Sequence, residues 1–312
     1  PTASFDALGN SAGGYPPDPV GDVGPAHYGA MSNLSLAVYS KAGATLYGPA
    51  ANNTLWAGFG GACEAENAGQ PMVVYDQFAD RWLLAQMTAA GPTHFVCVAL
   101  STGGDPTGTY YRWAFPTGAN VPDEPKLAVW RDAYYLSTRE RQGALFQGVG
   151  AYALDRAEML AGAASPQVIA FLVAPGGSAA DIGDGLRPAG VDGSALPPAG
   201  APAPFLGTMD DGAILGALQD ALTLWRFHAD FATPEDSTFT LGATLASQPF
   251  DTLFPLPAPI PQPWTTRKLD VLSYWQRAQH RVAYRNFGGH EALVANQTVE
   301  GAADMAGIRW WE

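Results

Sequence analysis

The sequence predicts an all-β protein, a single β-propeller built from four-stranded antiparallel blades, and the strand count indicates about five blades. Between Gly58 and Pro116, four short runs rich in Val, Leu, Tyr, Trp and Phe are separated by Gly, Pro, Asp or Asn. Four consecutive antiparallel strands have this pattern. The same cadence recurs along the chain, as in repeat architectures. The 36 glycines and 26 prolines fall between the runs, which indicates many tight turns.

Residues 1–25 are expected to form a loop, and residues 26–312 the propeller. The first blade is predicted at His27–Asn33, Leu36–Ser40, Thr45–Tyr47 and Thr54–Phe59. The second is predicted at Pro71–Tyr75, Arg81–Met87, His94–Leu100 and Tyr110–Phe115. The third is predicted at Lys126–Arg131, Ala133–Thr138, Gly148–Leu154 and Val168–Val173, with a helical turn at Asp155–Gly162.

The fourth blade is predicted at Arg187–Asp192, Pro204–Met209, Ala221–Asp230 and Ser237–Ala246. The last is predicted at Arg277–Phe287, Glu291–Val299 and Ile308–Trp311, one strand short of the others. A strand at Ala3–Leu8 could pair with Ile308–Trp311 and close the ring, because closure removes an exposed sheet edge. An open multi-sheet β-sandwich is the alternative architecture.

The charge balance restricts the partners. The net charge is −13 and only 14% of residues are charged. A surface this acidic argues against nucleic acid, whose phosphates require Lys and Arg, and against anionic membrane surfaces. No apolar run approaches the roughly 18–20 residues that cross a bilayer, so no membrane insertion is expected.

The two cysteines, Cys63 and Cys97, fall within the second blade or the loop leading into it. We expect a disulfide between them; two buried free thiols are the alternative. The chain begins with Pro1 instead of methionine, which we interpret as the mark of a processed chain. Together these features favour a secreted or cell-surface protein.

Several motifs keep their order over most of the chain. They include PPDPVGDVGPAHY, STGGDPTGTYYRWAFP, YALDRAEMLAG, LTLWRFHADF and HRVAYRNFGGHEALVANQTV. With these motifs the chain resembles a family of uncharacterised exported bacterial β-propeller proteins that are sialidase-like in style. The resemblance implies a propeller fold and export, and it implies no particular reaction.

Acidic residues beside Gly and Pro are the candidate metal ligands. Asp18 and Asp22 lie in PPDPVGDVG, a loop that offers several backbone carbonyls as well. Calcium takes six to eight oxygen ligands, so calcium is the cofactor that this loop could hold. The alternative is that both aspartates stabilise turns through their side chains.

Charged residues near the starts of inner strands are the candidate catalytic residues, because inner strands of a propeller converge on its axis. They are Asp123, Glu124, Lys126, Arg285 and His290. Carboxylates with a positioning cation are what glycoside hydrolysis requires. An ion-pair network between blades is the alternative for the first four, and a loop-fixing hydrogen bond is the alternative for His290.

These residues predict an extracellular glycan-binding or glycan-processing propeller, with a polysaccharide or a cell-surface partner. A structural or adhesive module without catalysis is the alternative. Some other hydrolase or lyase is the third hypothesis.

Overall fold

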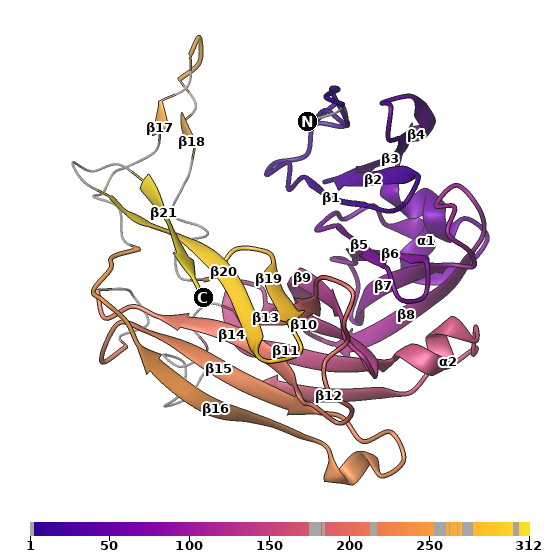
Figure 1. Ribbon diagram of the computed structural model, residues 1–312. Helices are drawn as coiled ribbons and strands as arrows, with labels where there is room; N and C mark the ends of the chain where they lie inside the picture. The colour runs from indigo at the N-terminus through magenta and orange to yellow at the C-terminus, as the bar shows by residue number, and fades with distance from the viewer. Residues whose placement is uncertain are drawn as a thin grey trace. The chain divides into compact units, whose positions relative to one another are not determined.

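The computed structural model describes residues 3–174, 182, 185–212, 217–252, 260–261, 263–266, 268–269, 277–301 and 306–312 (Figure 1). The chain divides into two compact units, Pro1–Val168 and Ile169–Glu312. It is all-β, and three sheets in the described residues are antiparallel and four-stranded with strands in chain order, as the sequence predicted. None of the helices in the described residues is long and apolar enough to cross a bilayer.

The first sheet has the order β1-β2-β3-β4. Its strands are β1 (Val20–Val23), β2 (His27–Ser32), β3 (Ser35–Ser40) and β4 (Thr45–Ala50). The strand expected at Thr54–Phe59 is instead a 3-10 helix, η1 (Asn52–Trp56). Trp56 is fully buried against the disulfide, so the chain turns inward here to fill a core.

The strand predicted at Ala3–Leu8 is wrong, because these residues form no strand. The ring of Phe5 instead packs on Tyr28 and Tyr39 of the first sheet, at centroid distances of 6.3 and 5.7 Å. A Cβ on Gly43 would lie 2.7 Å from the Phe5 ring, so the glycine makes this approach possible. Burying an aromatic ring here outweighs pairing a short, weakly apolar segment as a strand.

The second sheet has the order β5-β6-β7-β8. Its strands are β5 (Met72–Asp76), β6 (Arg81–Met87), β7 (His94–Ser101) and β8 (Tyr110–Gly118). A short helix, α1 (Gly61–Ala65), precedes it and carries Cys63. The predicted disulfide is confirmed: Cys63 is bonded to Cys97 on β7, with 5.7 Å between their Cα atoms. The bond therefore ties α1 to the middle of the sheet.

The third sheet has the order β12-β11-β10-β9. Its strands are β9 (Val121–Val129), β10 (Ala133–Gln142), β11 (Leu145–Asp155) and β12 (Val168–Val173). The predicted helical turn is α2 (Arg156–Leu160), and the Asp155 side chain caps it by accepting from the Glu158 amide. An aspartate at this position stabilises a helix start.

The first strands of these three sheets lie next to one another, since β1 contacts β5 and β5 contacts β9 (Figure 1). A shared apolar core includes Val74, Leu83, Val98, Leu127 and Leu136 from the second and third sheets. Adjacent first strands are the arrangement that a propeller requires of its innermost strands.

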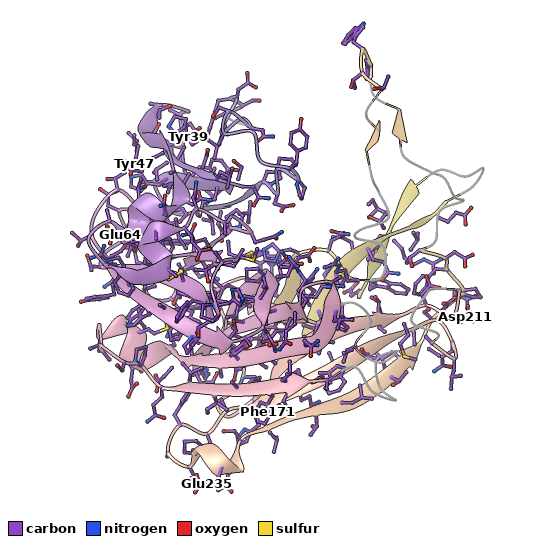
Figure 2. All side chains as sticks on the ribbon, turned by 180° about the vertical axis from the view of Figure 1, so that it is seen from behind. Tyr39, Tyr47, Glu64, Phe171, Asp211 and Glu235 are labelled. Carbon is purple, nitrogen blue, oxygen red and sulfur yellow. A yellow bond between two sulfur atoms is a disulfide. The ribbon has the colours of Figure 1, made fainter. Side chains whose placement is uncertain are left out.

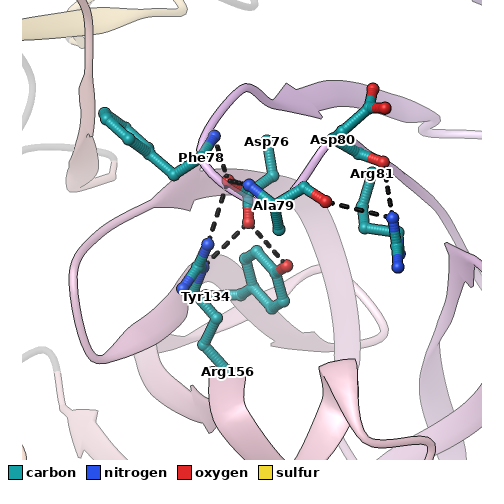
Figure 3. A network of polar contacts seen from close by, with 7 residues as sticks. All are labelled: Asp76, Phe78, Ala79, Asp80, Arg81, Tyr134 and Arg156. Carbon is teal, nitrogen blue, oxygen red and sulfur yellow. Dashed lines mark hydrogen bonds and ion pairs between the residues drawn. The ribbon is translucent and has the colours of Figure 1, made fainter. Parts of the chain in front are cut away.

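A buried carboxylate connects the second sheet to the third (Figure 3). Asp76, at the end of β5, has no exposed surface. It accepts hydrogen bonds from the Tyr134 hydroxyl and Arg156 Nε, both at 2.8 Å, and from the amides of Phe78 and Ala79. A charge without water must be paired and hydrogen-bonded in this way.

The second unit contains a seven-stranded sheet, β16-β15-β14-β13-β19-β20-β21. One group is β13 (Arg187–Val191), β14 (Ala203–Met209), β15 (Ala221–His228) and β16 (Thr238–Ala246), with η2 (Pro234–Asp236) before β16. The other is β19 (Val282–Asn286), β20 (Glu291–Glu300) and β21 (Ala306–Trp311). A separate pair consists of β17 (Ile260–Pro261) and β18 (Lys268–Leu269).

The two groups match the fourth and last predicted blades, yet they share one sheet. Strands β13 and β19 pair in parallel, with Ala189 opposite Val282 and Gly190 opposite Ala283. Val191 lies opposite Tyr284 in the same register. The division into one domain over residues 26–312 stays a prediction.

We predict that Asp76→Ala lowers the free energy of unfolding by about 3–5 kcal/mol, because it leaves the Arg156 guanidinium without its buried partner. Urea unfolding measures the change. Asp6→Ala, at an exposed aspartate, should stay within about 0.5 kcal/mol of the wild type. A loss below about 1 kcal/mol for Asp76→Ala would contradict this account.

We predict that reduction of the disulfide lowers the free energy of unfolding by about 3–4 kcal/mol, since the bond closes a 34-residue separation. Unfolding curves with and without a reductant measure the effect. The double variant Cys63→Ala, Cys97→Ala should have the reduced stability in both conditions, and any response of that variant to the reductant would count against the explanation.

Candidate functional site

A polar residue followed by proline occurs just before or within each of four strands, β1, β5, β9 and β13. The pairs are Asp18-Pro19 before β1, Gln70-Pro71 before β5, Glu124-Pro125 within β9 and Arg187-Pro188 in β13. Proline suits the first position of a strand, where no amide donor is needed. The sequence predicted a role for charged residues near the starts of inner strands, Glu124 among them, but the proline that follows each of these four polar residues was not part of that prediction.

Three of these polar residues adopt a left-handed backbone. The φ angles are +39° for Asp18, +52° for Gln70 and +50° for Glu124. Residues other than glycine rarely adopt this conformation, and they keep it where the surrounding structure enforces it. These three positions lie just before β1, just before β5 and within β9.

Glu124 lies in a β-bulge. Ser137 pairs with Lys126 and Arg139 pairs with Asp123, so β9 has one residue more than β10 over this interval. A bulge bends a strand and redirects a side chain. Glu124 is 7% exposed, so the bulge holds a carboxylate in a largely water-free position.

Asn33, at the turn between β2 and β3, fixes Asp18 and Gln70 together. Its Nδ2 donates to Asp18 Oδ2 at 2.8 Å, and its Oδ1 accepts from the Gln70 amide at 2.7 Å. The Asn33 amide also donates to the Pro17 carbonyl. One buried amide side chain thus sets the positions of two strand starts.

Asp18 belongs to the same electrostatic group as the predicted catalytic residues. Burial raises the pKa of its carboxyl, and the negative charges of Glu124 and Asp123 raise it further. The hydrogen bond from Asn33 and the charge of Lys126 lower this pKa in part. The structure therefore brings Asp18, Asp123, Glu124 and Lys126 together, and we call these four residues the carboxylate site.

Two arginines hold one of these carboxylates. Asp123 Oδ2 accepts from Arg141 Nε at 3.1 Å, and Arg139 Nη1 lies 3.9 Å from the same oxygen. Both arginines are on β10. The ion-pair alternative considered from the sequence therefore holds for Asp123.

Arg285 and His290 lie in the second unit. Phe287 lies between them: its ring stacks on His290 at 4.8 Å, and the Arg285 guanidinium is 5.8 Å from its centroid. All three are exposed. A role for Arg285 and His290 in the same site as Glu124 stays a prediction.

Asp22 has a different structural role from Asp18. Its Oδ1 accepts from the Val23 amide and its Oδ2 from the Tyr75 amide, both at 2.8 Å. The bond from the Tyr75 amide attaches β1 to β5, and the bond from the Val23 amide is local to β1. Calcium binding by Asp18 and Asp22 stays a prediction.

An acidic group that the sequence analysis missed lies in the second unit. Asp210, Asp211 and Asp220 each offer one carboxylate oxygen, all within 4.8 Å of one another, and could hold a cation such as calcium (Figure 2 labels Asp211). Burial raises the pKa of Asp210. Asp210 also accepts from the Thr252 amide at 2.7 Å and Asp220 from the Phe250 amide at 2.7 Å. The spacing of ten residues between Asp210 and Asp220 hid this group, because they come together through the pairing of Met209 with Ala221 at the ends of β14 and β15.

No protein-family model matches the chain, and no curated protein is similar to it. Among solved structures, it is similar to a GH43 β-1,3-galactosidase, with 12% identity, a TM-score of 0.42, and coverage of 93% of this chain and 54% of that one. It is also similar to an α-L-arabinofuranosidase from Lactobacillus brevis, with 9% identity, a TM-score of 0.42, and coverage of 93% and 85%. An α-L-arabinanase from Cellvibrio cellulosa in complex with arabinohexaose has 11% identity, a TM-score of 0.36, and coverage of 94% and 90%.

The chain thus spans about half the length of the galactosidase. These likenesses are distant, and they carry no conclusion about the activity of this chain.

We predict that the free energy of unfolding of Asp18→Asn, relative to that of the wild type, increases as the pH rises. Because the folded state raises the Asp18 pKa, it binds more protons than the unfolded state between the two pKa values, and stability falls as the pH rises through the folded value. Relative to the wild type, the variant should gain unfolding free energy between pH 3.5 and pH 7, as urea titrations at both pH values measure.

The matched variant is Asp22→Asn, which replaces an oxygen that accepts a backbone amide. It should be less stable than the wild type at pH 7 by about 1–3 kcal/mol. If Asp18→Asn instead shows no change with pH relative to the wild type, the raised pKa is refuted.

Proposed function

We propose that the protein is an extracellular glycoside hydrolase that acts on a polysaccharide at the carboxylate site. The observation that carries this proposal is the half-buried Asp18 carboxyl, whose pKa is raised by burial and by the neighbouring charges of Glu124 and Asp123. Cleavage of a glycosidic bond uses one carboxylic acid that donates a proton and one carboxylate that acts as base or nucleophile. Environments that separate the pKa values of neighbouring carboxyls supply that pair.

In this mechanism Asp18 is the general acid. Its proton passes to the glycosidic oxygen as the bond to the anomeric carbon breaks, so that the leaving sugar departs as an alcohol. The hydrogen bond from Asn33 Nδ2 fixes one carboxyl oxygen, which leaves the other to carry the proton. The left-handed backbone at Asp18 keeps the side chain in this orientation.

Glu124 is the partner carboxylate, and it stabilises the positive charge that develops at the anomeric carbon or activates the attacking water. Its low exposure strengthens its electrostatic effect, since little water screens it. Lys126 offsets part of the negative charge of the site. Asp123, paired with Arg139 and Arg141, contributes a fixed negative charge and no proton transfer.

Two further features support an extracellular setting. The Cys63–Cys97 disulfide is stable in oxidising compartments. The motif resemblance is to exported propeller proteins that are sialidase-like in style. A polysaccharide substrate also fits a protein of net charge −13, because most plant and microbial polysaccharides with neutral sugars are not repelled by it.

We predict that Asp18→Asn and Glu124→Gln each reduce the release of reducing sugar from the preferred polysaccharide at least 100-fold, because each removes a group that acts on protons or charge in the transition state. The free energy of unfolding of Glu124→Gln should change by less than about 1 kcal/mol. A panel of neutral and acidic polysaccharides, assayed with calcium and with a chelator, identifies the substrate first.

Glu235→Gln, at an exposed glutamate of η2, is the control and should keep full activity (Figure 2). If Glu124→Gln instead destabilises the fold by about 2–4 kcal/mol and activity follows the folded fraction, Glu124 is structural. If the wild type binds a polysaccharide and never cleaves it, hydrolysis is excluded and the adhesive alternative gains support.

A further inference from the structure

We infer that the first unit has a second saccharide-binding groove, apart from the carboxylate site, which takes a neutral sugar of the same polysaccharide. The inference rests on the proposed function for the identity of the polymer. The groove lies where the last strands of the first two sheets, β4 and β8, approach η1. Its main cavity has a volume of about 330 Å³, and a second cavity of about 240 Å³ continues from it, since Tyr110 and Arg112 line both.

The groove has an apolar floor and an aromatic rim. Leu36, Leu55 and Tyr110 form the floor, and all three pack on the core of the first two sheets. Tyr47, which is 40% exposed, stands at one side of the main cavity. Phe59, which is 38% exposed, lines the second cavity. Aromatic rings exposed at a cavity offer flat apolar faces together with polar edges.

The opposite wall is a loop that its own hydrogen bonds hold in place. Asp105 Oδ1 accepts from the Thr107 amide at 2.8 Å and from the Thr107 hydroxyl at 2.7 Å. The Tyr110 hydroxyl donates to the Pro106 carbonyl at 2.6 Å. A wall that is already ordered loses little conformational entropy when a ligand binds, so the groove is preformed.

Arg112 supplies the directional donors. Its Nη1 donates to the Ala57 carbonyl at 2.8 Å and to the Leu55 carbonyl at 3.5 Å, and its guanidinium lies 5.7 Å from the Phe59 centroid. Among the described residues, none accepts a hydrogen bond from its Nε or Nη2. A guanidinium held in place with unused donors is suited to bind the hydroxyl oxygens of a sugar.

The charges around the groove favour a neutral ligand over an anionic one. Glu64 lies close enough to Arg112 for their charges to interact, and its carboxylate is fixed by the amides of Gly58 and Gly60. Figure 2 shows Tyr47 and Glu64 on the same side of the first unit. The positive charge of Arg112 is thus offset locally, and the protein as a whole carries −13. An anionic sugar would meet net repulsion here, whereas hydroxyl groups would not.

The groove and the carboxylate site lie at opposite edges of the first sheet, to which both belong in part. Asp18 precedes β1 and Tyr47 lies on β4, three strand spacings apart, which corresponds to about 14 Å along the sheet. A single sugar cannot reach both places, and a chain of several sugars can. The groove would therefore raise the affinity for a polymer and leave the affinity for a short substrate unchanged.

The test measures binding by isothermal titration calorimetry, with linear hexasaccharides of glucose, xylose, galactose and arabinose, and with a galacturonate hexasaccharide as the anionic comparison. We expect the wild type to bind at least one neutral hexasaccharide more tightly than the galacturonate one. Tyr47→Ala and Arg112→Lys should each weaken that binding at least tenfold, while hydrolysis of a disaccharide substrate keeps its rate.

Two variants separate binding from folding. Leu46→Ala alters the neighbouring residue of β4, which points to the other face, and should bind as the wild type does. Tyr47→Phe keeps the ring and should retain most of the affinity. Binding that is unchanged in Tyr47→Ala and Arg112→Lys, a preference for galacturonate, or no binding of any neutral hexasaccharide would overturn the inference.

The two proposals fail in different ways. If the groove is absent, Glu124→Gln still abolishes hydrolysis of a short substrate. If the hydrolase proposal is wrong, calorimetry still detects binding of the neutral hexasaccharide, and Tyr47→Ala still weakens that binding.

Discussion

The Asp76 carboxylate is the constraint on which the arrangement of the first unit depends. It is fully buried, so its charge has to be satisfied by protein groups alone. Those groups come from the turn after β5, from Tyr134 on β10 and from Arg156 on α2, and they meet only when the second and third sheets have one particular placement (Figure 3). An apolar contact would tolerate sliding between sheets, whereas this network does not. The same placement sets β5 beside β9.

The carboxylate site is built on that placement. Once β1, β5 and β9 lie side by side, the residues before them are brought together although more than fifty positions separate them in sequence. Asn33 then fixes Asp18 against Gln70, and the bulge in β9 turns Glu124 toward a buried position. The strained φ angles at these residues are a cost that the rigid sheets can sustain.

The sequence predicted the strands well, because apolar runs between Gly and Pro report local structure directly. It also predicted the Cys63–Cys97 pairing. It failed at Ala3–Leu8, where a contact of Phe5 with the first sheet replaced a strand, and at η1, where burial of Trp56 decided the conformation. It named Asp123, Glu124 and Lys126, yet it assigned Asp18 to a metal site. Burial raises the Asp18 pKa, and the charges that raise it further lie on β9, about a hundred residues away, so no local pattern records them.

The carboxylate site and the groove differ in how the fold supports them. At the carboxylate site, charges are concentrated and partly dehydrated, the pKa of Asp18 is raised and the backbone is strained. In the groove, Arg112 is offset by Glu64, the loop is relaxed by its own hydrogen bonds, and the contacts are aromatic. The first set of features favours chemistry, and the second favours binding without chemistry. Because the first sheet carries Asp18 before β1 and Tyr47 on β4, a polymer bound at the groove would be held by a scaffold rigid enough to present one of its bonds to Asp18 and Glu124.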